Sequence, residues 1–200
     1  MNKTTTLYFV RHGETDWNVA GRFQGHADIE LNETGHKQAQ SLAHRLNGIP
    51  FDAIYTSPLK RAVSTALPTS QILDLPIITD ERIKEVFCGE WEGLVKPEMK
   101  ERDPELFEAW RKSRFNVRMP GGESMRDVQQ RMVDFYESIH HSGKLLLVVS
   151  HGGALLSLIN YLMDWDYDKA GREHFLVNTG VTTHPTHEIE LRLLHDTQEK

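Results

Sequence analysis

The sequence predicts an α/β fold, a three-layer sandwich around a mostly parallel sheet with a small helical insertion. Three observations support this prediction. Short apolar runs typical of buried strands alternate with longer segments whose apolar residues recur at helical spacing. The run at residues 145–149, Leu-Leu-Leu-Val-Val, is apolar throughout, as expected of a parallel strand covered on both faces. A polar segment at about residues 93–122 interrupts the alternation and predicts the insertion.

The first strand, helix and second strand lie in the N-terminal quarter of the chain. Residues 7–10 form a short apolar run that ends at Arg11, which predicts a buried strand. Apolar residues recur at helical spacing over residues 34–46, and Thr34 is positioned to cap this helix. Residues 51–56 then predict the second strand.

A second helix is predicted to begin at Ser57 and Pro58, because serine favours the N-cap and proline is tolerated in the first turn. Pro68 is expected to kink or end this helix, since proline lacks an N–H and its ring crowds the preceding turn. Residues 76–79 predict a short third strand.

The polar segment and the helix after it have clear boundaries. Residues 96–114 are expected to be mostly helical and broken at the Asp-Pro pair of residues 103–104, because a residue before proline avoids helical backbone. Residues 120–122, Pro-Gly-Gly, predict a loop. Residues 124–127, Ser-Met-Arg-Asp, have the spacing of a capping box and predict the start of the next helix.

The last third of the chain completes the predicted sheet. Residues 144–150 are the strongest strand signal, and residues 154–163 follow as an apolar helix. Residues 181–183 predict a closing strand. A final, half-exposed strand is predicted where apolar residues alternate with polar ones, at Ile189, Leu191 and Leu193.

Length and composition exclude several classes of protein. The 200 residues are 38% hydrophobic and 26% charged, as is ordinary for a globular protein, so we expect one domain over residues 1–200 with a helical lid or insertion at about 93–122. Acidic residues outnumber basic ones by 29 to 23, and the net charge of −6 argues against a nucleic acid or an anionic membrane as partner.

Two further features bear on the location of the protein. The one cysteine, Cys88, cannot form an internal disulfide, which excludes the small secreted scaffolds. The N-terminus lacks the apolar core of a signal peptide, and no apolar stretch approaches the roughly 20 residues of a membrane span. We therefore expect a cytoplasmic location and no integral membrane function.

Polar side chains suited to phosphate follow three of the predicted strands. Arg11 and His12 come after the first strand, Arg61 comes shortly after the second, and His151 and Gly152 follow the strongest one. Ligands of open α/β sheets bind outside the carboxyl ends of the strands, so we expect these side chains to meet at one rim.

This set of residues suits phosphoryl transfer. The guanidinium groups of Arg11 and Arg61 match phosphate oxygens bidentately and stay charged at any working pH. Neutral imidazole is a nucleophile near pH 7, so His12 would accept the phosphoryl group and pass it to water. Backbone N–H groups at Gly152, at a predicted helix start, add donors for an anion. Each residue alone has an ordinary structural explanation, but their convergence favours the catalytic one.

These residues lie in segments that resemble the histidine phosphatase superfamily, in its phosphoglycerate mutase-like branch. The resemblance covers nearly the whole chain, and its segments occur in the family's order. They are LYFVRHGETDWN (7–18), LNETGHKQAQSLAHRL (31–46), TSPLKRAVSTA (56–66), EVFCGEWEG (85–93), PGGESMRDVQQR (120–131) and VVSHGGAL (148–155).

The resemblance implies that His12 is the phosphorylated nucleophile. It implies that three side chains complete the phosphate pocket, namely Arg11, Arg61 and His151. It further implies that Glu85 donates a proton to the leaving oxygen. A carboxylic acid beside a doubly charged phosphate suits this role, because like-charge repulsion favours its protonated form.

Three more residues are carried over from the family's pattern. Asn18 matches a phosphate-contacting asparagine, and Gln24 and Gly25 lie where the family's loop approaches the phosphate. The function implied is that of a metal-independent histidine acid-type phosphatase. It would hydrolyse small phosphorylated metabolites through a phosphohistidine and need no cofactor. Its substrate is left open among α-ribazole phosphate, phosphoserine, sugar phosphates or a broad range, and so is its oligomeric state, with a homodimer among the alternatives.

Two other functions are kept as alternatives. A phosphoglycerate mutase of this family is expected to carry an adjacent arginine pair for the second acidic group, and the sequence has no Arg-Arg dipeptide. Residues 86–88 read Val-Phe-Cys where the mutase pattern has Arg-His-Tyr. A catalytically silent phosphate-binding or scaffold protein is the second alternative, disfavoured because every expected pocket residue is present.

Three smaller alternatives concern individual side chains. A metal site built from Glu14, Asp16, His12 and His26 is disfavoured, because arginines in the pocket compete with a cation. Packing is favoured over substrate contact for Trp91 and Trp110. A solvated helix face is favoured over an acid-binding role for the basic residues of the insertion, which are Lys96, Lys100, Arg102, Arg111, Lys112, Arg114 and Arg118.

Overall fold

The computed structural model describes residues 5–170, 178–179, 181–185 and 192–194. Within these residues six strands form one sheet in the order β3-β2-β4-β1-β5-β6. The strands are β1 (Thr6–Arg11), β2 (Ala53–Thr56), β3 (Ile77–Thr79), β4 (Leu145–Ser150), β5 (Val181–Pro185) and β6 (Arg192–Leu194). The first four run parallel to one another, whereas β5 pairs antiparallel with both β1 and β6.

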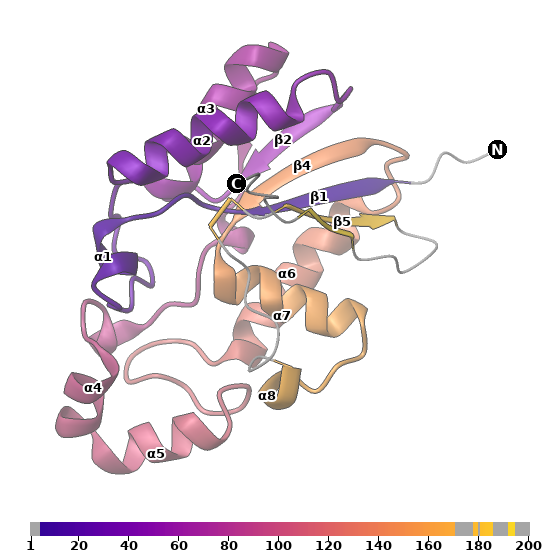
Figure 1. Ribbon diagram of the computed structural model, residues 1–200. Helices are drawn as coiled ribbons and strands as arrows, with labels where there is room; N and C mark the ends of the chain where they lie inside the picture. The colour runs from indigo at the N-terminus through magenta and orange to yellow at the C-terminus, as the bar shows by residue number, and fades with distance from the viewer. Residues whose placement is uncertain (1–4, 171–177, 180, 186–191, 195–200) are drawn as a thin grey trace.

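The helices of the described residues cover both faces of this sheet. They are α1 (Asp16–Val19), α2 (Glu33–Leu46), α3 (Lys60–Leu73), α4 (Lys96–Arg102), α5 (Pro104–Lys112), α6 (Met125–Ile139), α7 (Gly152–Leu162) and α8 (Tyr167–Ala170). Helices α2 and α3 lie on one face and α6 and α7 on the other, while α4 and α5 lie away from the sheet (Figure 1). The predicted three-layer α/β sandwich with a mostly parallel sheet and a small helical insertion is therefore confirmed.

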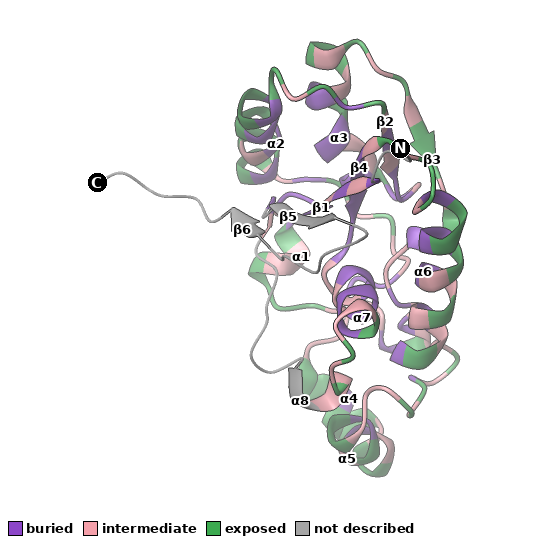
Figure 2. Cartoon of the chain, turned by 90° about the vertical axis from the view of Figure 1, so that its right-hand side faces the viewer, coloured by how far each residue is buried: buried purple, intermediate pink, exposed green. Residues whose placement is uncertain are grey.

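The core lies on both faces of the central strands. Phe9 and Val148 pack into the cluster that contains α6 and α7, whereas Val10 and Val149 pack into the cluster under α2 and α3. Successive strand side chains point to opposite faces, so a continuous apolar run fills both layers. Burial of one such side chain stabilises the fold by about 1.5–3 kcal/mol. In Figure 2 the buried residues concentrate on the strands and on the helix sides that face them.

The predicted starts of α2 and α3 were wrong by a few residues. Helix α2 is capped by Asn32, whose side chain accepts a hydrogen bond from Gly35 N at 2.8 Å, and not by Thr34. Helix α3 begins at Lys60 and not at Ser57 and Pro58. The Ser57 N–H still donates to the Val149 carbonyl at 3.0 Å, so the sheet's hydrogen bonding holds the chain extended past the predicted start.

Helix α3 also continues past Pro68, which was predicted to kink or end it. Pro68 is buried within the helix, and the fully buried Ala62 and Ala66 hold the same helix against the sheet. Tertiary packing of this face outweighs the one backbone hydrogen bond that proline removes. Helix α7 begins at Gly152, two residues earlier than predicted. Its N-cap is His151, whose backbone is extended, and the helix follows directly.

The remaining boundaries largely follow the sequence. Helices α4 and α5 are separated at Asp103, which precedes Pro104, and Ser124 and Asp127 form the predicted capping box of α6. Strand β5 covers the predicted residues 181–183. For the last predicted strand, Ile189 and Leu191 lie outside the described residues. Among those described, no helix has the length and apolar character that crossing a bilayer would need.

Candidate active site

The carboxyl ends of two adjacent parallel strands bring two histidines together. Strand β1 pairs with β4 so that Arg11 lies opposite Ser150, and the next residues are His12 and His151. The His12 N–H donates to the Ser150 carbonyl at 2.9 Å. The two imidazole rings lie 5.1 Å apart between centroids. The sequence prediction that these strand ends converge is borne out by this geometry.

The hydrogen bonding of His12 defines which ring nitrogen is free to react. Its Nδ1 lies 2.7 Å from the Gly13 carbonyl oxygen, which can only accept, so Nδ1 carries a proton. In the neutral ring the lone pair is then at Nε2. Burial, followed by the charges of Arg61 and Arg11, lowers the pKa of His12 well below its ordinary value of 6.5. The ring is therefore held neutral, as a nucleophile requires.

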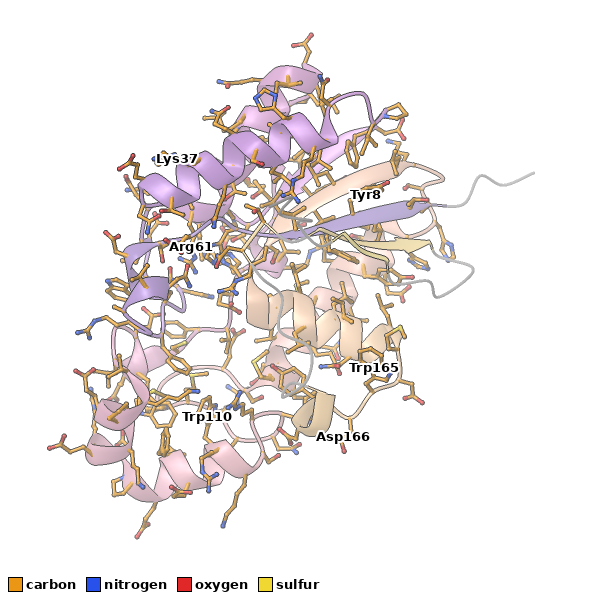
Figure 3. All side chains as sticks on the ribbon, in the orientation of Figure 1. Tyr8, Lys37, Arg61, Trp110, Trp165 and Asp166 are labelled. Carbon is orange, nitrogen blue, oxygen red and sulfur yellow. The ribbon has the colours of Figure 1, made fainter. Side chains whose placement is uncertain are left out.

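Arg61 is fully buried in the first turn of α3. Its Nη1 donates to the Ala27 carbonyl and its Nη2 to the Gly25 carbonyl, both at 2.8 Å. These bonds fix the guanidinium plane, and Nε has no hydrogen-bond partner among the described residues. Figure 3 shows Arg61 on the α3 side of the molecule, at the level where the strands end. A rigid, buried cation next to His12 is suited to phosphate.

His151 and Arg11 complete the cluster around His12. The His151 side chain is fully buried, and neither of its ring nitrogens has a hydrogen-bond partner among the described residues. Burial, followed by the charge of Arg61, lowers the pKa of His151 well below its ordinary value. Burial also lowers the pKa of Arg11, and the charge of Glu85 opposes this shift. A bound anion would therefore stabilise this cluster of side chains.

Glu85 reaches the first turn of α7 from a loop. Its Oε2 accepts from Gly153 N at 3.1 Å, and its Oε1 accepts from Ala154 N at 3.0 Å and from Val86 N at 2.9 Å. A methyl group at Gly153 would lie 2.6 Å from Oε1, so an alanine there would displace the Glu85 carboxylate from this position. Glu85 therefore lies at the positive end of the helix dipole, beside Arg11 and Arg61.

A network that the sequence analysis missed fixes the loop carrying Glu85. Arg131 Nη1 donates to the carbonyls of Arg82 and Lys84 at 2.7 and 2.6 Å, and Nη2 donates to that of Glu85 at 2.8 Å. The same guanidinium forms a two-pronged pair with the Glu123 carboxylate, at 3.0 and 2.9 Å. Its signal was present in the resembling segment 120–131, which ends at Arg131.

The other predicted site residues have different degrees of support. Asn18 lines the cavity, and its Oδ1 accepts from Thr15 N and Oγ1, both at 3.1 Å, which leaves its NH₂ group as the donor for a ligand. Gln24 is buried, and its Oε1 has no partner among the described residues. Gly25 and Gly152 line the cavity beside the arginines.

These groups open into one cavity of about 530 Å³. Its inner pocket is lined by Arg11, His12, Arg61, Glu85 and Gly152. His151 does not line the cavity and packs against the ring of His12. The outer chamber is lined mainly by aromatic and apolar side chains and by three cations, Arg22, Lys96 and Arg114. Its aromatic residues include Trp17, Phe23, Trp110 and Tyr167.

Comparison with known proteins agrees with this geometry. Residues 7–195 match the histidine phosphatase superfamily, branch 1. The chain belongs to the histidine phosphatase superfamily. It is 38% identical over 185 residues to a metal-independent phosphoserine phosphatase of Arabidopsis thaliana, covering 90% of this chain and 76% of that protein.

Two further relatives of this superfamily frame the functional choice. One is a 2,3-bisphosphoglycerate-dependent phosphoglycerate mutase of Cytophaga hutchinsonii, 37% identical over 166 residues, with 78% of this chain and 76% of that protein covered. The other is the solved structure of Bacillus stearothermophilus YhfR, which superimposes with a TM-score of 0.86 at 34% identity over 98% of both chains. The solved structure shares the fold of this chain, whereas the printed names of the two sequence relatives differ in activity.

The two acidic residues that follow His12, Glu14 and Asp16, have structural explanations. Glu14 Oε1 accepts from Asn32 Nδ2 at 2.9 Å, and Asp16 lies in the first turn of α1. His26 Nε2 donates to the Glu85 carbonyl at 2.8 Å. Within the part of the chain that the structure describes, no three His, Cys, Asp or Glu side chains group as ligands for a metal ion.

The two tryptophans differ in role. Trp91 is fully buried, and its Nε1 donates to Asp103 Oδ2 at 2.7 Å, so its role is packing, as predicted. Trp110 is also nearly buried and packs edge-on to Trp91 at 5.6 Å, but it lines the outer chamber as well.

Cys88 is buried, which raises the pKa of its thiol.

Proposed function

We propose that this protein is a phosphomonoesterase that hydrolyses small phosphorylated metabolites through a phosphohistidine at His12, without a metal ion. The observation that carries the proposal is the 2.7 Å hydrogen bond from His12 Nδ1 to the Gly13 carbonyl. It leaves the Nε2 lone pair of a neutral ring beside two buried arginines. A nucleophile and a phosphate site then coincide.

The proposed reaction has two steps that use the same groups. Nε2 of His12 attacks phosphorus, the bond from phosphorus to the ester oxygen breaks, and Glu85 gives that oxygen a proton. Water then attacks the phosphohistidine, Glu85 takes the proton from the water, and phosphate leaves with the ring neutral again. Arg11 and Arg61 hold the non-bridging oxygens in both steps, so their charge offsets that of the transferred group.

A phosphoglycerate mutase is the second candidate, because one of the relatives carries that name. Mutase action needs charged groups that hold the acceptor beside the acid and a closed cavity that protects the phosphoenzyme from water. Residues 86–88, Val-Phe-Cys, supply no charge beside the acid, and Cys88 is buried. These residues favour water as the acceptor, and so favour the phosphatase.

One experiment distinguishes the candidates. The protein is incubated with a panel of phosphorylated metabolites that includes 3-phosphoglycerate, with and without 2,3-bisphosphoglycerate, while free phosphate and 2-phosphoglycerate are both measured. We expect phosphate release from part of the panel and no appreciable 2-phosphoglycerate. Interconversion that outruns phosphate release about tenfold, roughly 1.4 kcal/mol in barrier height, would establish a mutase. Absence of turnover on the whole panel would leave a phosphate-binding or scaffold protein.

We also propose that residues 1–200 act as one unit, with residues 93–122 as the roof of the cavity. Support comes from Lys96 and Trp110, which line the same cavity as Arg11 and His12. A small phosphorylated metabolite as the partner and a cytoplasmic location belong to the same proposal. Limited proteolysis that released residues 93–122 without loss of activity would contradict the role of this segment.

A further inference from the structure

The basic side chains of the segment 93–122 separate into two groups in the structure. Four of them form ion pairs at the surface: Lys100 and Arg111 with Glu108, Arg102 with Glu90, and Arg118 with Asp127. Lys112 is exposed and does not line the cavity. The two that line the cavity are Lys96 and Arg114. Neither has an ion pair with a carboxylate within the described ranges.

Arg114 is held in place by an aromatic ring. Its guanidinium carbon lies 4.8 Å from the centroid of the Trp110 ring, and the side chain is half-buried. Figure 3 shows Trp110 near α5, below Arg61 in this view. Stacking occupies one face of a guanidinium and leaves the N–H groups at its edge available. A half-buried cation without a carboxylate partner is stabilised by an anion that enters the cavity.

Tyr167 connects this cation to the catalytic groups. Burial, followed by the charge of Glu85, raises the pKa of Tyr167, and the charge of Arg114 lowers it. Tyr167 is therefore close enough to both side chains to feel each charge, and all three line the cavity. An ester whose phosphate lies at His12 would extend past Glu85 and Tyr167 toward Arg114.

Many of the side chains that line the same cavity are apolar. Trp17, Phe23, Met119, Met125 and Leu156 line the chamber, and Phe23 packs edge-on to Trp110 with ring centroids 5.7 Å apart. Such walls favour an apolar or aromatic body over a sugar, whose hydroxyl groups would lose hydrogen bonds to water. The outer chamber thus combines apolar walls with the guanidinium of Arg114.

We propose that the outer chamber binds a leaving group with an apolar or aromatic body that ends in a carboxylate, and that Arg114 is the residue that selects this carboxylate. Lys96, which is exposed at the rim, adds only long-range attraction. This inference rests on the proposed phosphatase function and deepens it, because it defines the substrate class as phosphate monoesters of apolar hydroxy acids.

The test compares two substrates that differ in charge and hardly in leaving-group chemistry. They are the phosphate monoesters of 4-hydroxyphenylacetate and of its amide, since the methylene group insulates the phenol from the carboxylate. For the unaltered protein we expect kcat/KM to favour the acid by roughly tenfold or more, as for a hydrogen bond between charged groups. We expect the preference to lie mainly in KM and to fall as salt is added.

Three variants sharpen this test. Arg114→Met is expected to bring the ratio of kcat/KM for the acid to that for the amide close to one. Arg114→Lys is expected to keep part of the preference, since lysine has the positive charge but lacks the planar guanidinium that binds both carboxylate oxygens. The matched control is Arg111→Met on α5, whose guanidinium pairs with Glu108 at the surface and does not line the cavity. We expect this control to keep the full ratio.

The outcomes distinguish failure of the inference from failure of the proposed function. If the unaltered protein hydrolyses both esters with equal kcat/KM, or if Arg114→Lys and Arg114→Met both keep the full preference, Arg114 does not select a carboxylate while the phosphatase assignment stands. If neither these esters nor any of the phosphorylated metabolites above is hydrolysed, the proposed function itself has failed. Should Arg114→Met prove unfolded, the ratio in the unaltered protein and in Arg114→Lys decides.

Discussion

The inner pocket and the outer chamber of the same cavity are built in different ways. In the inner pocket, His12 and Arg61 are buried and held by hydrogen bonds to backbone carbonyls. In the outer chamber, Arg114 is half-buried and rests on Trp110, and Lys96 is exposed. Backbone-anchored groups suit a reaction that tolerates little displacement, whereas stacked side chains adapt to different bodies. The proposed chemistry and the proposed selectivity thus belong to separate parts of the fold.

The largest expected effect is that of His12→Ala. This change removes the nucleophile, so we expect turnover to fall by at least about 10⁴-fold for acidic and neutral esters alike. Rapid quench with labelled substrate should trap an acid-labile, base-stable adduct on the unaltered protein and none on the variant. The control is His36→Ala on the exposed side of α2, which should behave as the unaltered protein. A normal burst in His12→Ala would contradict the assignment.

The next effect is that of Glu85→Gln, which keeps the shape of the side chain and removes the proton donor. We expect alkyl esters, whose leaving oxygens are strongly basic, to slow by about 10²–10⁴-fold, and aryl esters to slow much less. The measurement is kcat across a series of leaving groups, with Glu105→Gln on the surface as control. Equal slowing of all esters would mean that Glu85 only positions the phosphate or the water.

A smaller effect is expected on stability as the pH is lowered. Burial depresses the pKa values of His12 and His151 in the folded protein, so below pH 6.5 the unfolded chain binds more protons than the folded one. Stability is thus fully present above the unfolded pKa and is lost as the pH falls toward the folded values. We expect up to about 1.4 kcal/mol per pH unit for each histidine.

Urea unfolding in phosphate-free buffer between pH 8 and pH 5 measures this loss. Replacement of one of the two histidines, as in His151→Gln, should make the pH dependence shallower over this range. A stability that stays flat from pH 7 to pH 5 would mean that His12 and His151 take up protons in the folded protein over the same pH range as in the unfolded chain.

The smallest expected effect is that of a metal chelator. The inner pocket supplies its positive charge from Arg11 and Arg61, so exhaustive chelation is expected to leave the rate on both esters unchanged. The measurement is kcat/KM before and after dialysis against chelator. Loss of activity that magnesium, manganese or zinc restores would show that a cation takes part, and Glu14 and Asp16 would be the first residues to replace.

The sequence predicted the inner pocket better than the outer chamber for a physical reason. His12 and His151 follow buried apolar runs, and parallel strands place their carboxyl ends at one edge whatever the rest of the chain does. The backbone pattern alone was therefore enough to bring the two rings together. The strand boundaries followed from the same pattern.

Side-chain partnerships were beyond the reach of the sequence. Lys96 and Arg114 cannot be told from Arg111 by residue type or spacing, because only the folded chain shows which of them meet a carboxylate. Arg131 was missed for the same reason, since its partners are backbone carbonyls some 46 to 49 residues earlier in the chain. The prediction that α3 kinks or ends at Pro68 was wrong because packing of this helix against the sheet outweighs the local preference of proline for a helix end.

The central position of β1 affects how activity is lost when the protein unfolds. The strand that carries Arg11 and His12 lies between β4 and β5, and the His12 amide donates to Ser150 on β4. Fraying starts at the margins of a sheet, so deuterium should replace the hydrogen on this amide only when the whole sheet opens. His12 is then displaced only when the whole sheet unfolds. We therefore expect the loss of activity on denaturation to coincide with unfolding of the protein.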